Sequence, residues 1–149
     1  RAMRKVQGQS TSCPGSISQA AAVAALNGPQ DCVEQMRQAF RSRYEYFRAA
    51  LNSIPGVDCP SCEGAFYAFP SFQGVIDRMA HLQDAGPRAA WPHDDVELAE
   101  WLLDSAGVST VPGAAFGAPG HLRLSYAASL EYLENAVQRI RTAIEKAWS

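Results

Sequence analysis

Apolar residues recur at steps of three and four along two long stretches of the chain, and this spacing predicts two amphipathic helices. The first begins at Asp31, with Glu34 three residues on as a capping box, and the segment from Asn52 to Pro55 ends it. Its apolar stripe covers about five turns, which is long for a helix of a compact domain. Ser129 is expected to cap the second helix. The apolar positions are Val33, Met36, Phe40, Tyr44, Phe47 and Leu51 in the first helix, and Leu130, Leu133, Val137, Ile140 and Ile144 in the second.

The N-terminal thirty residues predict shorter elements. Residues 1–6 have the character of a helix end, and residues 7–14 are polar and rich in turn-forming residues, as in a loop. Ser16 is then expected to cap a helix that runs through Leu26. This helix is small and apolar on nearly all sides, which is typical of helices packed on both faces.

A further helix is predicted in the second half of the chain. Asp94 or Asp95 is expected to cap it, and Gly107 to end it. Residues 71–95 before it show no clear periodicity, and an irregular stretch of this length is often a functional loop or is disordered.

Short alternating segments predict strands between these helices. Residues 56–59 and 64–69 are expected to pair with each other, while 108–111 and 122–126 form two more strands. The order is therefore helix, long helix, two strands, helix, two strands, helix. It predicts an α/β (α+β) sandwich in which helices pack on a small, mostly antiparallel sheet.

Composition narrows the class of protein. The chain has 149 residues, enough for one domain with a hydrophobic core, and 47% of them are hydrophobic and 19% charged, as in soluble globular proteins. A formal net charge of -2 gives no support to nucleic-acid binding or to a basic membrane surface. No apolar run approaches the roughly 20 residues that span a bilayer, and the N-terminus lacks the features of a signal peptide. We expect a cytoplasmic protein with no nucleic-acid or membrane partner.

Four cysteines are present, and Cys59 and Cys62 form the one Cys-x-x-Cys pair. A structural zinc site usually needs two such pairs or histidines at close spacing, and the three histidines are scattered. We interpret the pair as incidental and reduced, with a redox or metal role as the alternative. No metal site is assigned.

One cation stands among apolar neighbours in the last predicted strand. Arg123 lies between Leu122 and Leu124, and a buried cation needs an anionic partner, either a structural carboxylate or a bound ligand. A guanidinium suits a carboxylate because two parallel hydrogen bonds join them. His121 would share its face of the strand and is a second candidate ligand contact. The glycine-rich loop 113–120 before them leads into a strand rather than a helix N-terminus, so we interpret it as a tight connection and not as a phosphate cradle.

Other titratable groups have plain interpretations. Lys5 and Lys146, the only lysines, are interpreted as surface residues. Asp94 and Asp95 are interpreted as a helix cap rather than a metal-binding pair. No nucleophile elbow, P-loop or dinucleotide fingerprint occurs.

Several segments, taken together and in order over nearly the whole chain, resemble the C-terminal part of class I aminotransferases. The resemblance is strongest to bacterial aspartate aminotransferases of the type that often also use prephenate. The segments are Gln7–Pro14 (QGQSTSCP), Gln19–Ala22 (QAAA), Gly64–Pro70 (GAFYAFP), Ala106–Val108 (AGV) with Val111–Gly113 (VPG), and Phe116–Ala127, which includes Arg123-Leu-Ser-Tyr-Ala.

This resemblance implies a pyridoxal-phosphate-dependent enzyme with the type I aminotransferase fold. Such an enzyme transfers an amino group between L-aspartate, or a similar acidic amino acid, and a 2-oxo acid, and works as a homodimer with active sites at the subunit interface. Residues 1–30 would be a remnant of the large cofactor domain, 31–53 a long interdomain helix and 54–149 the C-terminal small domain.

The resemblance also implies two substrate-binding residues. Arg123 would bind the substrate α-carboxylate, and Ser10 would reach the partner subunit's site and help to hold the distal carboxylate. The family's Schiff-base lysine lies in a motif upstream of residue 1, so no catalytic or cofactor-binding residue is expected in this chain. The chain also does not begin with Met, so we expect it to be a fragment. Because the Schiff-base lysine is absent, we expect this fragment to be inactive alone and to bind no pyridoxal phosphate. The alternative is a non-enzymatic, aminotransferase-like effector module of a transcription regulator.

Overall fold

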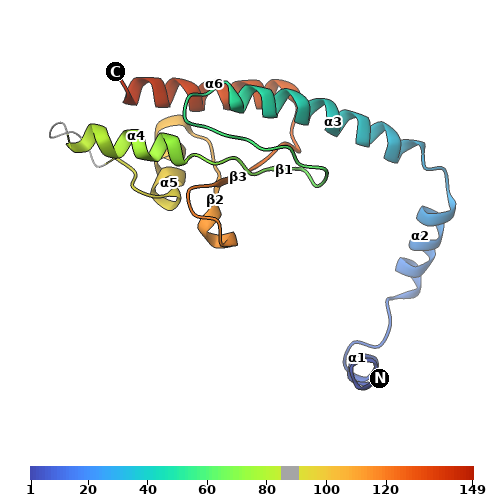
Figure 1. The fold of residues 1–149 in the computed structure, drawn as a ribbon. Helices are drawn as coiled ribbons and strands as arrows, with labels where there is room; N and C mark the ends of the chain where they lie inside the picture. Colours follow the sequence, from blue (N-terminus) through green and yellow to red (C-terminus); the bar gives the residue numbers. More distant parts are fainter. Residues whose placement is uncertain (85–90) are drawn as a thin grey trace. The chain divides into compact units, whose positions relative to one another are not determined.

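The computed structural model describes residues 1–84 and 91–149 (Figure 1). Contacts between residues divide the chain into two compact units, Arg1–Arg37 and Gln38–Ser149, and each is described here by itself. The division falls within the long helix α3, Asp31–Asn52, whose predicted start and end are both confirmed.

The first unit contains two helices whose side chains are all exposed, α1 (Ala2–Ser10) and α2 (Ser16–Asn27). The loop predicted from residue 7 is wrong for its first residues, because α1 continues to Ser10. In its last turn the Ser10 hydroxyl donates to the Val6 carbonyl (2.9 Å). The predicted cap at Ser16 is wrong by one residue, since Gly15 is the N-cap and Ser16 is the first helical residue.

The second unit is built on a three-stranded sheet in the order β1–β3–β2. Its strands are β1 (Tyr67–Ala68), β2 (Val111–Pro112) and β3 (Leu122–Ser125). Tyr67 pairs with Ser125 and Val111 pairs with Arg123, both in antiparallel register. The predicted antiparallel sheet is confirmed, with β3 at its centre, but the strand predicted at 108–111 is wrong except for its last residue, because β2 begins at Val111.

The pairing predicted between residues 56–59 and 64–69 is wrong. Asp58 instead pairs with Ser71, and the two residues exchange backbone hydrogen bonds of 2.9 and 2.7 Å. Ser71 also bridges to His121, just before β3. The first predicted strand therefore contributes a single bridge at the margin of the sheet and no hairpin.

Polar side chains of α3 hold the segment that follows. The Tyr44 hydroxyl accepts from the Cys62 N–H (2.6 Å), and the Asn52 side chain accepts from the Cys59 N–H (2.7 Å) and donates to its carbonyl (3.1 Å). Arg48 donates to the same carbonyl (3.1 Å). These bonds satisfy backbone groups that have no strand partner, so this segment runs along a helix instead of pairing with residues 64–69.

The sequence predicts that residues 71–95 are irregular. This prediction is wrong for a large part of the segment, which contains helix α4 (Gln73–Asp84). Its buried side chains Val75, Ile76 and Met79 occupy one helix face. The apolar residues of α4 are few, and Gly74 stands at the start of the helix, so its helical period could not be recognised in the sequence. Residues 85–90, the remainder of the predicted irregular segment before Trp91, lie outside the described residues.

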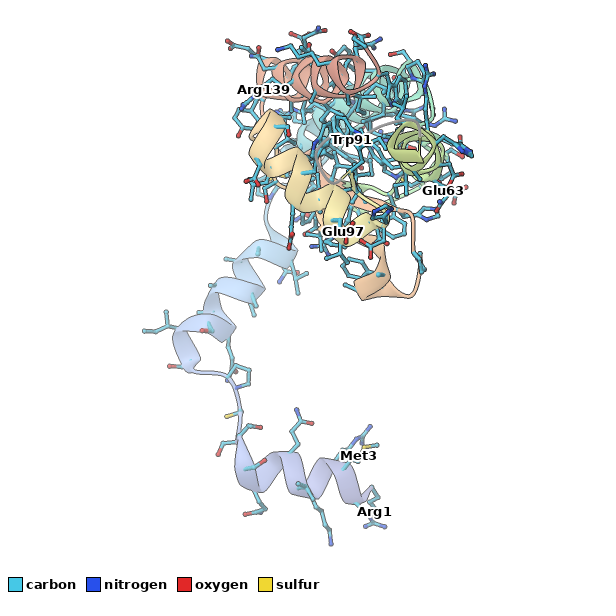
Figure 2. The ribbon with its side chains drawn as sticks, turned by 90° about the vertical axis from the view of Figure 1, so that its left-hand side faces the viewer. Arg1, Met3, Glu63, Trp91, Glu97 and Arg139 are labelled. Atoms are coloured by element: carbon cyan, nitrogen blue, oxygen red, sulfur yellow. The ribbon has the colours of Figure 1, made fainter. Side chains whose placement is uncertain are left out.

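The core lies between one face of the sheet and the helices. Figure 1 shows α6 (Leu130–Ala147) on one side of the strands and the 3-10 helix η1 (Gly113–Phe116) on the other. Figure 2 shows the side chains gathered between α6, α4 and α5 (Asp95–Ala106). The core includes Phe47, Leu51, Val75, Met79, Leu98, Leu102, Leu122, Leu124, Val137, Ile140 and Ile144. The predicted class, helices packed on a small antiparallel sheet, is confirmed.

Both ends of α5 and the start of α6 follow the expected signals. The Asp94 carboxylate accepts from the N–H groups of Val96 (2.9 Å) and Glu97 (2.8 Å) and caps α5. Gly107 ends that helix in the left-handed region with φ 60°. The Ser129 hydroxyl accepts from the Tyr132 N–H (3.2 Å) and caps α6. These three predictions are confirmed.

Two glycines meet at the start of α4. Gly56 has φ +82°, and a Cβ on Gly74 would lie 2.9 Å from the Gly56 Cα and 3.0 Å from its carbonyl oxygen. We expect Gly74→Ala to lower the free energy of unfolding by about 1–3 kcal/mol, because the two backbones must separate. Urea denaturation followed by tryptophan fluorescence measures the change. Gly64→Ala is the matched control, since no atom lies within 4 Å of its added Cβ. Equal losses in both variants contradict the close-approach argument.

Candidate functional site

The side chains of β3 alternate between the core and the opposite side of the sheet. Leu122 and Leu124 are buried, whereas Arg123 is half-buried and lies on the other face. Tyr67 pairs with Ser125, so it shares this second face. We call the surface formed by Tyr67, Phe69, Phe116, His121 and Arg123 the outer face.

Two aromatic rings lie against the Arg123 guanidinium. Its central carbon is 4.5 Å from the Tyr67 ring centroid and 4.7 Å from that of Phe116. Such contacts are electrostatically favourable, and they hold the plane of the group while leaving its N–H edges free. Among the side chains that the structure describes, no carboxylate forms an ion pair with Arg123. The structural carboxylate that the sequence left open as a partner is therefore not found among the described residues.

The same rings extend into a small aromatic cluster. Phe116 meets Phe69 edge to face, with centroids 6.1 Å apart, and Phe69 stacks on His121 at 5.3 Å. The His121 Nδ1 lies 3.1 Å from the Pro119 carbonyl. His121 and Arg123 thus share the outer face, as alternation predicts, but the His121 ring is engaged by its own loop and by Phe69.

A buried carboxylate holds the loop that carries Phe116. Asp95, the first residue of α5, is 1% exposed, and its two oxygens accept from the N–H groups of Ala114 (2.7 Å) and Gly120 (3.0 Å). Burial alone would raise the pKa of this carboxyl, but the backbone N–H donors outweigh burial and lower the pKa. Asp95 therefore remains ionised at neutral pH.

This arrangement changes the interpretation of the loop 113–120. Its backbone N–H groups do surround an anion, but the anion is the carboxylate of Asp95 from the same chain. Gly113 is required for the closure, since a Cβ there would lie 2.7 Å from the His121 Cβ and 2.8 Å from its carbonyl oxygen. Sequence reasoning assigned Asp95 only to the helix cap. An acidic residue directly after a capping Asp is a weak signal, because only tertiary contact reveals its partners.

The other predicted site residues lie elsewhere. Ser10 belongs to the first unit and ends α1, exposed, with its hydroxyl donating to Val6. Lys5 lies on α1 and Lys146 in the last turn of α6. The assignments of Arg123 and Ser10 to substrate binding remain predictions that this geometry does not test.

Cys59 and Cys62 are both free thiols. Cys59 is buried, and burial raises the pKa of its thiol to about 11, so the thiolate is scarce at neutral pH. Within the part of the chain that the structure describes, no group of three or more His, Cys, Asp or Glu residues is placed to hold a metal ion. Over residues 1–84 and 91–149, no helix is long and apolar enough to cross a membrane.

The family described as "Aminotransferase class I and II" matches residues 1–140, so the chain belongs to this family. Among its curated relatives is the aspartate/prephenate aminotransferase of Nitrosomonas europaea, 44% identical over 143 residues, which cover 96% of this chain and 35% of the relative. Another is the aspartate aminotransferase of Geobacillus stearothermophilus, 45% identical over 97% of this chain and 34% of the relative. The chain thus spans about a third of the length of the curated relatives it matches.

A solved structure agrees with these relatives. The crystal structure of the aspartate aminotransferase from Rhizobium meliloti superimposes with a TM-score of 0.81 at 42% identity, over 97% of this chain and 34% of that one. The architecture is therefore that of one part of a type I aminotransferase, as the sequence resemblance implies.

Asp95→Asn is expected to lower the free energy of unfolding at pH 7 by about 1–3 kcal/mol, because an NH2 group then replaces the oxygen that accepts from one of the two N–H donors. The pKa of Asp95 is lower in the folded than in the unfolded chain. Its stabilisation is therefore fully present above the unfolded value of about 4 and is lost as the pH falls through the folded value. Urea denaturation at pH 7 and at about pH 3 should show the wild-type advantage shrinking in acid.

Asp94→Asn is the matched control for this comparison. Asn and Asp are similarly good N-caps, so stability at pH 7 should change little. A wild-type advantage over Asp95→Asn that is the same at both pH values argues against the ionised carboxylate as its source.

Proposed function

We propose that this chain is the C-terminal part of an aminotransferase that exchanges an amino group between an acidic amino acid such as L-aspartate and a 2-oxo acid. The observation that carries the proposal is the outer-face Arg123, held by two aromatic rings and without a carboxylate partner among the described side chains. In this proposal residues 1–30 belong to the large cofactor domain, 31–53 to the interdomain helix and 54–149 to the small domain.

The chemistry of the guanidinium supports the choice of ligand. An α-amino acid carries a planar carboxylate, and Arg123 can join it with two parallel, charge-assisted hydrogen bonds. The rings of Tyr67 and Phe116 restrict the guanidinium plane, so the carboxylate is held in a defined orientation. Orientation of the substrate is the part of the reaction that these residues contribute.

Selection of an acidic side chain is assigned to Ser10, which we propose reaches the site of a partner subunit in a homodimer. The curated relatives are named for aspartate or for aspartate and prephenate, which supports an acidic substrate.

Pyridoxal phosphate is the cofactor that the family implies, and when bound it supplies the electron sink for the reaction. We propose that the residues of this chain do not hold it. Lys5 is on an exposed helix and Lys146 in the last turn of α6, while Arg123 is arranged for a planar carboxylate. We therefore assign the cofactor site to another part of the complete enzyme.

The alternative, an effector module of a transcription regulator, gains no support from the comparisons. The relatives and the solved structure described above are aminotransferases that match at least 96% of this chain. No feature of the outer face favours the regulator over the enzyme.

In the complete enzyme, Arg123→Lys is expected to raise the KM for the amino acid about 10- to 100-fold, because lysine cannot form the two parallel hydrogen bonds. Steady-state kinetics with L-aspartate measures the effect. The control is Arg78→Lys, since Arg78 also stacks on a ring, that of Trp148 at 4.1 Å, but lies on α4. Unchanged kinetics in the Arg123 variant refute the carboxylate-binding role.

The isolated chain is expected to bind no pyridoxal phosphate at a defined site. After incubation with the cofactor and reduction by borohydride, intact-mass and peptide analysis should find no stoichiometric adduct. A single, fully modified Lys5 or Lys146 contradicts the assignment of the cofactor site to another part of the enzyme.

A further inference from the structure

Asp95 and Arg123 are linked through the loop between β2 and β3. The two N–H groups that bind the Asp95 carboxylate belong to Ala114 and Gly120, one on each side of Phe116 in the sequence. Phe116 in turn lies against the Arg123 guanidinium. The buried Asp95 carboxylate is therefore hydrogen-bonded to the loop backbone on both sides of Phe116.

The ring of Phe116 is not fixed by burial. Phe116 is 51% exposed, so its position depends largely on the backbone of the loop. Within the loop, the Gly113 N–H donates to the His121 carbonyl (2.7 Å) and the Ala118 N–H to the Gly113 carbonyl (3.0 Å). These bonds shape the loop, whereas the Asp95 bonds attach it to a helix of the core.

We propose that Asp95 is a positioning residue for Arg123: its carboxylate gathers both sides of the loop and so places Phe116 against the guanidinium. The consequence for the substrate rests on the proposed function, but the positioning itself does not. Two acceptors on one rigid group are needed, because the two N–H donors come from residues six positions apart in the chain.

Replacement of Asp95 by Asn removes one of the two carboxylate oxygens that bind the loop. Ala114 and Gly120 donate to different oxygens of Asp95, and Asn replaces one of these oxygens by an NH2 group, so one of the two N–H donors then faces another donor. The unsatisfied N–H must move toward water, and the loop and Phe116 move with it. Arg123 then keeps only the Tyr67 ring and gains freedom of rotation, which weakens a two-point hydrogen bond to a carboxylate.

Nuclear magnetic resonance of the 149-residue chain tests the positioning directly. Because the rings of Tyr67 and Phe116 lie against the Arg123 guanidinium, we expect them to shield its side-chain protons and displace their signals upfield. Phe116→Leu should remove the share of this upfield displacement that the Phe116 ring causes. We expect Asp95→Asn to remove the same share of the displacement and Asp94→Asn to leave the displacement unchanged. An Arg123 signal that is the same in Asp95→Asn as in wild type overturns the proposal. If Asp95→Asn does not fold, Asp95→Ser replaces it, since a smaller hydroxyl accepts one N–H and admits water to the other.

Kinetics of the complete enzyme give the second readout. Asp95→Asn should raise the KM for the amino acid more than it lowers kcat, with a loss of up to about 100-fold in kcat/KM. In the Phe116→Leu background it should add little, because both changes remove the same contact. If Asp95→Asn lowers kcat/KM by the same factor in the wild-type enzyme and in the Phe116→Leu variant, the proposal that Asp95 acts through Phe116 is overturned.

The two proposals fail in different ways. If Arg123→Lys leaves the KM unchanged, the proposed function is refuted, while the resonance test on the 149-residue chain still decides the positioning. If Arg123→Lys raises the KM and Asp95→Asn changes neither the Arg123 signals nor the KM, the positioning proposal is refuted and the proposed function stands.

Discussion

The central strand β3 has to meet two environments within four residues, and the second unit is arranged around this constraint. Leu122 and Leu124 point into the core, while Arg123 between them carries a charge that a core would not tolerate. Strand alternation resolves the conflict, because it places the guanidinium on the outer face of the same strand. Any slip of one residue in the register of β3 would exchange the two environments, so the antiparallel pairs on both of its sides also determine where the charge lies.

In the proposed function that charge binds a ligand, so its partners within this chain must not neutralise it. Tyr67 and Phe116 serve this purpose, since aromatic rings stabilise a guanidinium without occupying its N–H groups. A negative charge is nevertheless present nearby in the fold, as the Asp95 carboxylate, but its oxygens are taken by the Ala114 and Gly120 N–H groups. Asp95 is therefore hydrogen-bonded to the loop backbone, while the Arg123 guanidinium lies against two aromatic rings.

Local signals in the sequence determined the helices best. The apolar spacing and the caps at Asp94 and Ser129 are local features, and the structure confirms them. The strand pairing failed for a non-local reason, because side chains of α3, such as Tyr44 and Asn52, take the backbone hydrogen bonds of residues 59–62. Helix α4 was missed because its apolar residues are few and Gly74 stands at its start. That glycine is required by the approach of Gly56, which only the folded chain shows.

The sequence by itself determined the helices with a long apolar stripe, the isolated position of Arg123 and, through its resemblance, the family to which the chain belongs. Tertiary structure alone decided which groups surround that arginine. Phe116 and Tyr67 approach it from separate segments of the chain, and Asp95 binds two N–H groups of the Phe116 loop from a helix that begins 28 residues before Arg123. Hydrogen bonds and ring contacts of this kind depend on distance in space, and local periodicity carries no information about them.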